Sequence, residues 1–361
     1  MLTFPKTAAL DTANGSSLTD LVGFGSNPGD LRAKAFVPQK LAQPAALVVV
    51  LHGCTQTAAA YDHGAGWSAL AARHGFALLF PEQQRANNPN LCFNWFRPSD
   101  TARDSGEAAS IRQMIARMCE DHPIDPGRIF VTGLSAGGAM TSAMLAIYPE
   151  LFAGGAIIAG IAYGCAGTVG EAFECMGGRT SSPATVLGDN VRRASPHPGP
   201  WPRVAVWHGS NDATVTASNG DDIVKQWLNV HGLRAKPHVV ETVDGYPHRA
   251  WQGKDGTPLV EQYVITGMGH GTPLAPGDSA GQSGAAGPHM LDVAISSTDR
   301  IAAGWGLTDT VVAQKAPKSE QKSPKAAASA TSAPQAKEHA SPASALQSVI
   351  EDALRAGGLI R

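Results

Sequence analysis

Hydrophobic positions alternate between two patterns from about residue 45 to residue 305. Residues 45–52 (AALVVVLH) form an unbroken apolar run, which is typical of a strand buried on both faces. In residues 107–120 (EAASIRQMIARMCE) the large apolar side chains instead recur three or four positions apart, which predicts an amphipathic helix. Cys119 lies next to that apolar face, and we expect it to belong to the core.

The same two patterns repeat along the chain and predict an α/β fold, with a mostly parallel sheet covered by helices on both faces. An antiparallel edge pair is expected before them, at 18–24 and 31–38. Further strands are predicted at 76–81, 128–135, 154–160, 201–209, 236–243 and 259–266. Helices are predicted at 67–75, 136–149 and 221–232, and residues 290–305 continue the series.

The pattern changes near the C-terminus, and divides the chain into three parts. Residues 1–310 are expected to form one catalytic domain. Residues 311–343 are an Ala/Pro/Ser/Lys tract that lacks the apolar side chains needed to offset its ordering entropy, which predicts a disordered linker. Residues 344–358 place Leu346, Val349, Ile350 and Leu354 on one face of a short helix. That helix is expected to dock on its own domain or on a partner or granule surface.

Composition narrows the class of protein. Of 361 residues 43% are hydrophobic and 16% charged, with a formal net charge of −2, so nothing marks a nucleic-acid partner. No apolar run is long enough to span a bilayer, and the first residues do not resemble a signal peptide. The five cysteines and twelve histidines show no zinc-site spacing, so no metal and no cofactor is expected.

The segment VTGLSAGG, residues 131–138, places Gly133, Ser135 and Gly137 in a GxSxG pattern between a predicted strand and a predicted helix. That context is typical of a nucleophile elbow, in which small neighbours allow a sharp turn and the serine hydroxyl stands above the sheet edge. The alternative is a glycine-rich helix start with only a structural role. We predict that Ser135 is a nucleophile.

A serine nucleophile requires a base, and the base requires an acid that orients it. In this architecture the acid and then the histidine follow the serine along the chain. Asp212 comes just after the strand at 201–209, and His270 lies on a glycine-flanked loop after the strand at 259–266. The competing acids are helix-start charges or turn residues: Asp221, Asp222, Asp189 and Asp244. The competing histidines lie at a helix end, at a strand start, in turn-like segments or before the acid: His231, His238, His248, His289 and His208.

Several longer segments resemble one known family, the poly(3-hydroxybutyrate) depolymerase-like esterases, which belong with feruloyl and acetylxylan esterases among the α/β-hydrolases. The resemblance covers roughly residues 20–305, and the most specific segments are HGCTQ, CFNWF and GLSAGG. It implies an α/β-hydrolase fold and supports the triad Ser135, Asp212 and His270. The chain departs from the family after His270, where HGTPLAPG replaces a tryptophan-containing run, and no β-rich polymer-binding domain follows.

The same resemblance gives Cys54 a role. Its position two residues after His52 first indicates a thiol nucleophile, but in this fold the loop after that strand supplies a backbone N–H to the oxyanion hole, and Ala136 supplies the other. We therefore assign the two donors to the Cys54 and Ala136 amides. We expect Cys54 to pair with Cys92, and Cys165 with Cys175, leaving Cys119 free. Five reduced cysteines, as in a cytosolic chain, are the alternative.

Together these features predict a serine carboxylic-ester hydrolase that cleaves short 3-hydroxyacyl esters, including poly- or oligo(3-hydroxybutyrate), through an acyl-enzyme. A feruloyl or acetylxylan esterase acting on plant cell wall is the first alternative, because the same triad serves both reactions. A non-catalytic polymer- or granule-binding protein is the second. The resemblance implies an extracellular protein, whereas the lack of a recognisable signal peptide leaves a cytoplasmic one open.

Overall fold

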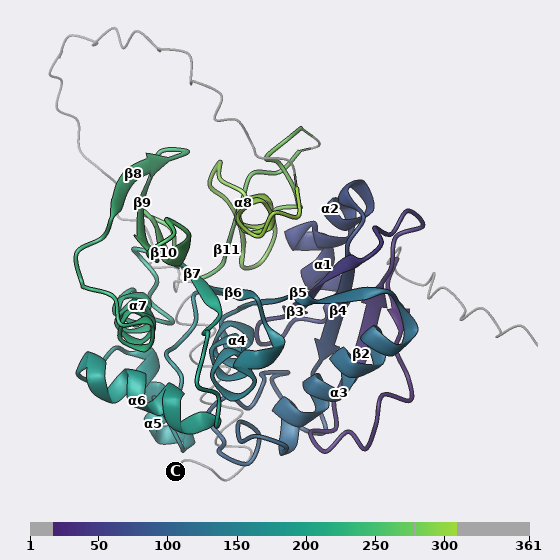
Figure 1. Ribbon diagram of the computed structural model, residues 1–361, viewed down its shortest axis with the longest axis horizontal. Coiled ribbons are helices and arrows are strands. Elements are labelled where there is room, and N and C mark those ends of the chain that lie inside the picture. Colours follow the sequence, from purple (N-terminus) through teal and green to yellow (C-terminus); the bar gives the residue numbers. More distant parts are fainter. Residues whose placement is uncertain (1–16, 278, 309–361) are drawn as a thin grey trace, which may run out of the picture.

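A ten-stranded mixed sheet organises the computed structural model, which describes residues 17–277 and 279–308 (Figure 1). Six neighbouring strands in its centre are parallel, as the alternating pattern predicted. In spatial order they are β4 (Ala77–Glu82), β3 (Ala45–Leu51), β5 (Ile124–Leu134), β6 (Gly154–Ile158), β7 (Arg203–Gly209) and β10 (Pro258–Ile265).

Antiparallel strands close both edges of the sheet. The expected N-terminal pair, β1 (Thr19–Asp20) and β2 (Arg32–Phe36), extends the sheet beyond β4. At the opposite edge β9 (Tyr246–Gln252) and β8 (Val239–Val243) follow β10. The prediction that His248 lies in a turn is wrong, because the turn is at residues 244 and 245 and His248 is paired within β9.

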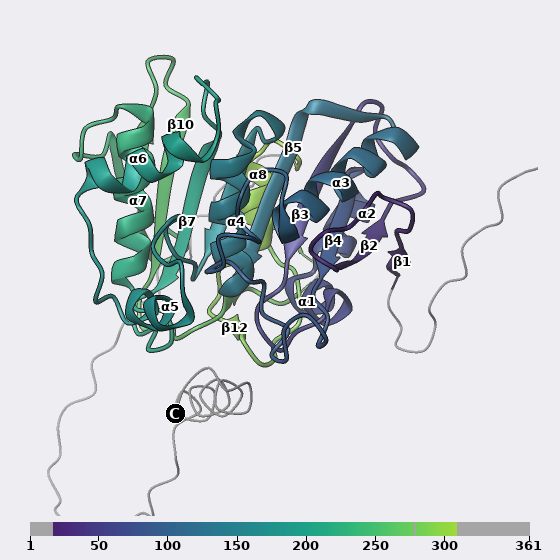
Figure 2. The same cartoon turned by 90° about the horizontal axis from the view of Figure 1, so that it is seen from below.

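The sheet is covered on both faces, and the alternation of β3 shows why. Leu47, Val49 and Leu51 belong to one buried cluster, and Val48 and Val50 belong to the other, since successive side chains of a strand point to opposite faces. The first cluster is completed by α3 (Gly106–Asp121), α4 (Ala136–Ile147), α6 (Ala184–Ala194) and α7 (Ser218–His231). The second is completed by α1 (Ala58–Ala65), α2 (Trp67–His74) and α8 (Ser297–Gly304), which lie on the other side of the sheet in Figures 1 and 2.

Other local predictions need correction. Asp189 was expected in a turn but lies within α6. The sequence pattern did not predict α6 or the preceding helix α5 (Val169–Met176). Both helices are short, and each contains a glycine, Gly170 in α5 and Gly188 in α6, a residue that is unfavourable within a helix. Cys119 is exposed and free and does not belong to the core: the buried stripe of α3 runs through Met114 and Met118, and residue 119 points away from it.

The predicted linker at 311–343 and helix at 344–358 lie outside the described residues, as does the first part of the chain. Within the described part no helix is long and apolar enough to cross a membrane. The same residues contain no group of three or more His, Cys, Asp or Glu side chains arranged to hold a metal ion.

Candidate active site

The carboxyl ends of four parallel strands bring together residues that are far apart in the sequence. Cys54 follows β3, Ser135 follows β5, Asp212 follows β7 and His270 follows β10. Because these strands run in the same direction, the four following loops meet at one edge of the sheet, where sites of open α/β sheets are found.

Ser135 stands on a strained turn between β5 and α4. Its backbone has φ 57° and ψ −117°, which few residues with a side chain adopt, and its N–H donates a 2.9 Å hydrogen bond to the Ile158 carbonyl at the end of β6. The Ser135 carbonyl then accepts the first bond of α4, from the Ala139 N–H at 2.8 Å. This conformation is the nucleophile elbow expected from the GxSxG pattern.

The glycines around Ser135 permit close packing of backbones. A Cβ on Gly137 would lie 2.3 Å from the Leu51 carbonyl oxygen and 2.5 Å from that of His52. A Cβ on Gly133 would meet the Gly137 backbone at 2.5 Å. The end of β5 and the first turn of α4 therefore pack directly against the end of β3. This packing fixes the position of Ser135 relative to the loop after β3.

His270 bridges Ser135 and Asp212 by hydrogen bonds. Its Nδ1 lies 2.7 Å from Asp212 Oδ2, and its Nε2 lies 2.9 Å from Ser135 Oγ. An ionised carboxylate only accepts hydrogen bonds, so Nδ1 carries the proton of the neutral ring. The lone pair of Nε2 is then directed at the Ser135 hydroxyl, which is the arrangement of a general base next to a nucleophile.

Asp212 is an almost completely buried carboxylate with donors on both oxygens. Burial by itself would raise its pKa, but hydrogen-bonding and Coulombic contacts with His208 and His270 outweigh that effect and hold the pKa of Asp212 well below its usual range. The Thr214 and Val215 amides also donate to Oδ1, each at 2.9 Å. Asp212 is therefore ionised at neutral pH, and can stabilise a positive charge on His270.

The loops that carry Asp212 and His270 are bonded to each other. The Ser210 N–H donates to the Ile265 carbonyl and the Asn211 N–H donates to the Met268 carbonyl, both at 3.0 Å. The Gly267 N–H returns a 2.9 Å bond to the Ser210 hydroxyl. Asp212 and His270 are thus held in register by contacts that extend the pairing of β7 and β10.

The loop after β3 presents one free amide. The Gly53 N–H donates to Gln56 Oε1 at 2.8 Å, and the Thr55 N–H donates to the Asn90 carbonyl at 2.7 Å. Within the described residues the Cys54 N–H between them has no hydrogen-bond acceptor. Ala136 is the first residue of α4, where helix amides have no partner inside the helix. These are the two donors that the sequence assigned to an oxyanion hole.

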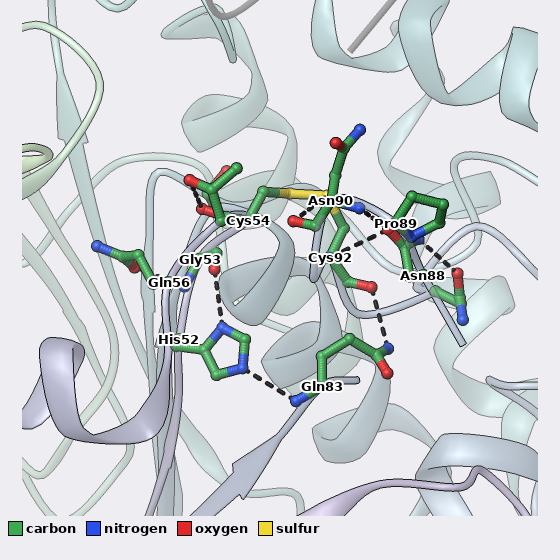
Figure 3. Close-up of a disulfide and its surroundings, with 12 residues drawn as sticks. His52, Gly53, Cys54, Gln56, Gln83, Asn88, Pro89, Asn90 and Cys92 are labelled. Atoms are coloured by element: carbon green, nitrogen blue, oxygen red, sulfur yellow. Dashed lines mark hydrogen bonds between the residues drawn. A yellow bond between two sulfur atoms is a disulfide. The ribbon is translucent and has the colours of Figure 1, made fainter. Parts of the chain in front are cut away.

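A disulfide fixes this loop from the outside (Figure 3). Cys54 is bonded to Cys92 on the loop after β4, so the sulfur of Cys54 is not a free thiol. Below it, His52 Nδ1 donates to the Gly53 carbonyl at 2.8 Å and His52 Nε2 accepts the Gln83 N–H at 3.1 Å. Both ring nitrogens are engaged and burial lowers the pKa of His52, so this ring does not serve as a base.

A buried carboxyl group supports the same region. Gln83 Nε2 donates to the Cys92 carbonyl at 3.0 Å and to Glu107 Oε1 at 2.6 Å. Asn94 donates to both oxygens of Glu107, through its backbone N–H at 2.8 Å and its amide Nδ2 at 2.7 Å. The loop after β4, the start of α3 and the loop after β3 are joined in this way into one polar network beneath the Cys54–Cys92 disulfide.

The second predicted disulfide is also present, between Cys165 and Cys175. It fixes α5, whose last residue Met176 accepts the Thr216 N–H at 2.9 Å and thereby supports the turn that carries Asp212. Sequence reasoning did not find that support, nor Gln83 and Glu107, because a single polar side chain on a loop or at a helix start carries no periodic signal.

Two histidines that were set aside as alternatives to His270 lie next to the proposed acid and base. His208 Nε2 lies 3.5 Å from Asp212 Oδ2, and His289 Nδ1 lies 3.2 Å from the His270 carbonyl. Neither has a described contact with Ser135. A histidine at the end of the strand that precedes the acid is the signal by which His208 could have been recognised.

Comparisons with known proteins show the family of this chain. The family model described as esterase PHB depolymerase matches residues 33–238. The chain is 47% identical over 304 residues to a poly(3-hydroxyalkanoate) depolymerase C of Paucimonas lemoignei, a match that covers 84% of this chain and 73% of the relative. It is 32% identical over 278 residues to a feruloyl esterase B of Neurospora crassa, covering 73% of this chain and 92% of that protein.

A solved structure is similar over most of its length. An acetyl xylan esterase from Aspergillus awamori superposes with a TM-score of 0.69 at 25% identity, covering 81% of this chain and all of that one. The structural similarity therefore extends over most of this chain and the whole of that esterase.

Proposed function

Because the chain belongs to the PHB depolymerase esterase family and is a carboxylic ester hydrolase, we propose that it cleaves short 3-hydroxyacyl esters, including poly- and oligo(3-hydroxybutyrate), by a triad of Ser135, His270 and Asp212. The observation that carries the proposal is the continuous hydrogen-bonded chain from the Ser135 hydroxyl through His270 to the buried Asp212 carboxylate.

The reaction proceeds in two steps. Ser135 Oγ attacks the ester carbonyl carbon while His270 Nε2 takes its proton, and Asp212 stabilises the resulting imidazolium. The tetrahedral intermediate collapses, the proton moves from His270 to the departing alcohol oxygen, and Ser135 is left acylated. Water then attacks the acyl-enzyme with His270 again as the base, which releases the carboxylic acid and restores Ser135.

The negative oxygen of each tetrahedral intermediate requires preorganised donors. The Cys54 and Ala136 amides fit this role, since both lie beside Ser135 in the fold and neither is needed for strand or helix bonding. Loss of one such donor costs on the order of 3 kcal/mol of transition-state stabilisation. The rigidity of the loop after β3, fixed by Gly137, the Cys54–Cys92 disulfide and the Gln83 network, therefore belongs to the catalytic apparatus.

The similarity to a poly(3-hydroxyalkanoate) depolymerase favours a hydroxyacyl substrate over the plant-wall alternatives, because it is higher than the similarity to the feruloyl esterase. The two disulfides support an oxidising compartment, as expected for an enzyme that meets polymer outside the cell. A non-catalytic binding protein is disfavoured by the complete hydrogen-bonded triad.

Substitution of the nucleophile tests the mechanism. Ser135→Ala is expected to lower kcat on p-nitrophenyl butyrate by about a million-fold, to the detection limit, because in the described part of the chain no other hydroxyl contacts His270 Nε2. Ser142→Ala is the matched control, since Ser142 lies in α4, the helix that follows Ser135, is buried and makes no side-chain hydrogen bond within the described residues. Retained turnover in Ser135→Ala would contradict the triad.

The substrate class is tested separately. Rates on hydroxybutyrate oligomers, methyl ferulate and acetylated xylan should be measured side by side with the wild-type chain and with Ser135→Ala. We expect the highest kcat/KM on the hydroxybutyrate oligomers. A preference for either plant-derived ester would overturn the substrate and leave the triad intact.

A further inference from the structure

His208, the penultimate residue of β7, is a buried histidine to which the mechanism above gives no role. Only 3% of its side chain is exposed. Its ring is confined by the helix on that face of the sheet, since a Cβ on Gly220 of α7 would lie 3.1 Å from His208 Nδ1. This close approach and the burial of the ring restrict the orientations that the imidazole can adopt.

The polar contacts of His208 are directed at the turn that carries Asp212. Nε2 lies 2.8 Å from the Val215 carbonyl, which only accepts hydrogen bonds, so Nε2 carries a proton. The same N–H lies 3.5 Å from Asp212 Oδ2, the oxygen that receives the 2.7 Å bond from His270. The shorter contact is the hydrogen bond, and the longer one is an electrostatic contact between a donor and a carboxylate.

We propose that His208 is a positioning residue for the reaction, which holds the Asp212 turn through Val215 and shares with His270 the negative charge on Asp212 Oδ2. The proposal rests on the triad proposed above. His208 touches neither substrate nor Ser135, and acts only through the acid.

That residue 208 is a histidine supports a positioning role over a role in packing alone. His208 Nδ1 is buried and has no hydrogen-bond partner among the described residues, which costs free energy that an apolar ring of similar size would not. Val204 and Val206 on the same face of β7 show that apolar side chains fit there. A histidine is therefore useful at this position for its Nε2 proton.

The charged groups near His208 determine how loss of its N–H changes the stabilisation of the His270 imidazolium. Asp212 and His270 approach it from the two loops. On that face β6 and β10 offer no ionisable group, and α7 offers only Asp221, whose carboxylate accepts a bond from Gln262. With the His208 N–H removed, Asp212 Oδ2 interacts with His270 alone. The imidazolium of His270 is then stabilised more strongly relative to the neutral ring.

The pH dependence of kcat/KM on p-nitrophenyl butyrate tests the proposal, because its acidic limb reports the protonation of the base in the free enzyme. His208→Phe keeps a ring but removes the donor, and is expected to move that limb upward by about half a pH unit to one unit. The kcat should fall about tenfold, as for loss of the one hydrogen bond that holds the Asp212 turn, while KM is unchanged. His208→Gln restores a donor and should return the limb toward its wild-type position.

The matched control is His231→Phe. His231 is also a buried histidine whose Nε2 contacts a carbonyl, that of Pro202, at 3.1 Å, but it lies at the far end of α7. It should change thermal stability without moving the acidic limb. An unshifted limb in a folded His208→Phe, or an equal shift in His231→Phe, would overturn the positioning role. Failure of the triad itself would appear differently, as retained activity in Ser135→Ala.

Discussion

Glu107 is a buried residue that is connected to the proposed site through its hydrogen-bond partners. Its carboxyl group is fully buried at the start of α3 and receives donors from Gln83 and Asn94, which connect it to the loop that carries Cys54. Burial raises its pKa to about 8, because desolvation disfavours the charged form more than the surrounding amides favour it.

This raised pKa predicts a pH-dependent stability. The unfolded chain loses the Glu107 proton near its ordinary pKa of 4.5, whereas the folded chain keeps it until about pH 8. The stabilising contribution is therefore complete below about pH 4.5 and is lost as the pH rises through that window. In calorimetric scans from about pH 5 to 8, the Tm of the wild type should fall more than that of Glu107→Gln, which resembles the protonated acid.

The control for this comparison is Glu171→Gln, because Glu171 is an exposed carboxylate at the start of α5. Its Tm should follow the wild type at every pH. Parallel Tm curves for the wild type and Glu107→Gln would show that Glu107 does not titrate in this window.

At the scale of elements, the packing of α4 against β3 decides the geometry of the site. Gly137→Ala places a methyl group within 2.3 Å of the Leu51 carbonyl oxygen, so the first turn of α4 must move away from the loop after β3. We expect a loss of about 1–3 kcal/mol in the free energy of unfolding, as for overpacking elsewhere. The kcat should fall at least a hundredfold, as when one oxyanion donor is displaced.

Gly170→Ala is the matched control for this helix start. Gly170 lies in the first turn of α5, and an added Cβ meets no atom within 4 Å. It should leave kcat unchanged and stabilise the chain by up to about 1 kcal/mol. Urea unfolding and p-nitrophenyl butyrate kinetics measure both effects, and equal behaviour of the two variants would refute the packing argument.

The two disulfides connect elements differently, and their removal should have different consequences. Cys54 and Cys92 are 38 residues apart, and Cys165 and Cys175 are 10 apart. Chain entropy alone predicts losses of about 4 and about 3 kcal/mol in the free energy of unfolding. Replacing Cys54 and Cys92 with alanine should in addition lower kcat while leaving measurable turnover, since the Cys54 N–H remains but its loop is less constrained.

Replacing Cys165 and Cys175 is the control, with a smaller effect on kcat expected. Thiol titration of the denatured wild type should give one free thiol, from Cys119, because the other four cysteines are paired. Complete inactivity of a folded Cys54→Ala chain would instead restore the thiol-nucleophile alternative, and five thiols would contradict both bridges.

At the scale of the whole molecule, the site and both hydrophobic clusters lie within the described residues. The helix α8 completes the second cluster through Ile301 and Ala302, followed by Trp305, which stacks on Phe130 with ring centroids 4.7 Å apart. The chain ending at residue 312 should therefore turn over p-nitrophenyl butyrate within about twofold of the full-length rate, because none of the proposed site or core is removed.

Granule binding of the full-length and shortened chains tests the roles proposed for the segment after residue 312. If the predicted helix at 344–358 is an adhesive element, pelleting with granules should be lost in the shortened chain while soluble-ester turnover stays. Unchanged pelleting would place polymer binding on the catalytic domain. A large loss of soluble turnover would show that the proposed domain boundary near residue 310 is wrong.

The sequence by itself determined the parts of this protein that depend on local periodicity. Unbroken apolar runs such as residues 45–52 predicted the parallel strands, because a strand covered on both faces excludes polar side chains from either. The GxSxG pattern predicted the turn at Ser135, since its geometry requires small neighbours. The order along the chain then selected Asp212 and His270, and the family resemblance selected the cysteine pairs.

Only the tertiary structure decided which side chains support those residues. Gln83 and Glu107 act through contacts that join segments 24 residues apart, and no spacing in the sequence records them. His208 lies only four residues before Asp212, but only the fold shows that its Nε2 is directed at the Asp212 turn. The short helices α5 and α6 and the position of His248 within β9 depend on the neighbours against which they pack. Local patterns specify the central strands and the longer helices. The chemistry depends instead on the strand ends that meet on one side of the sheet, because only there do loops that are distant in the sequence come within hydrogen-bonding distance.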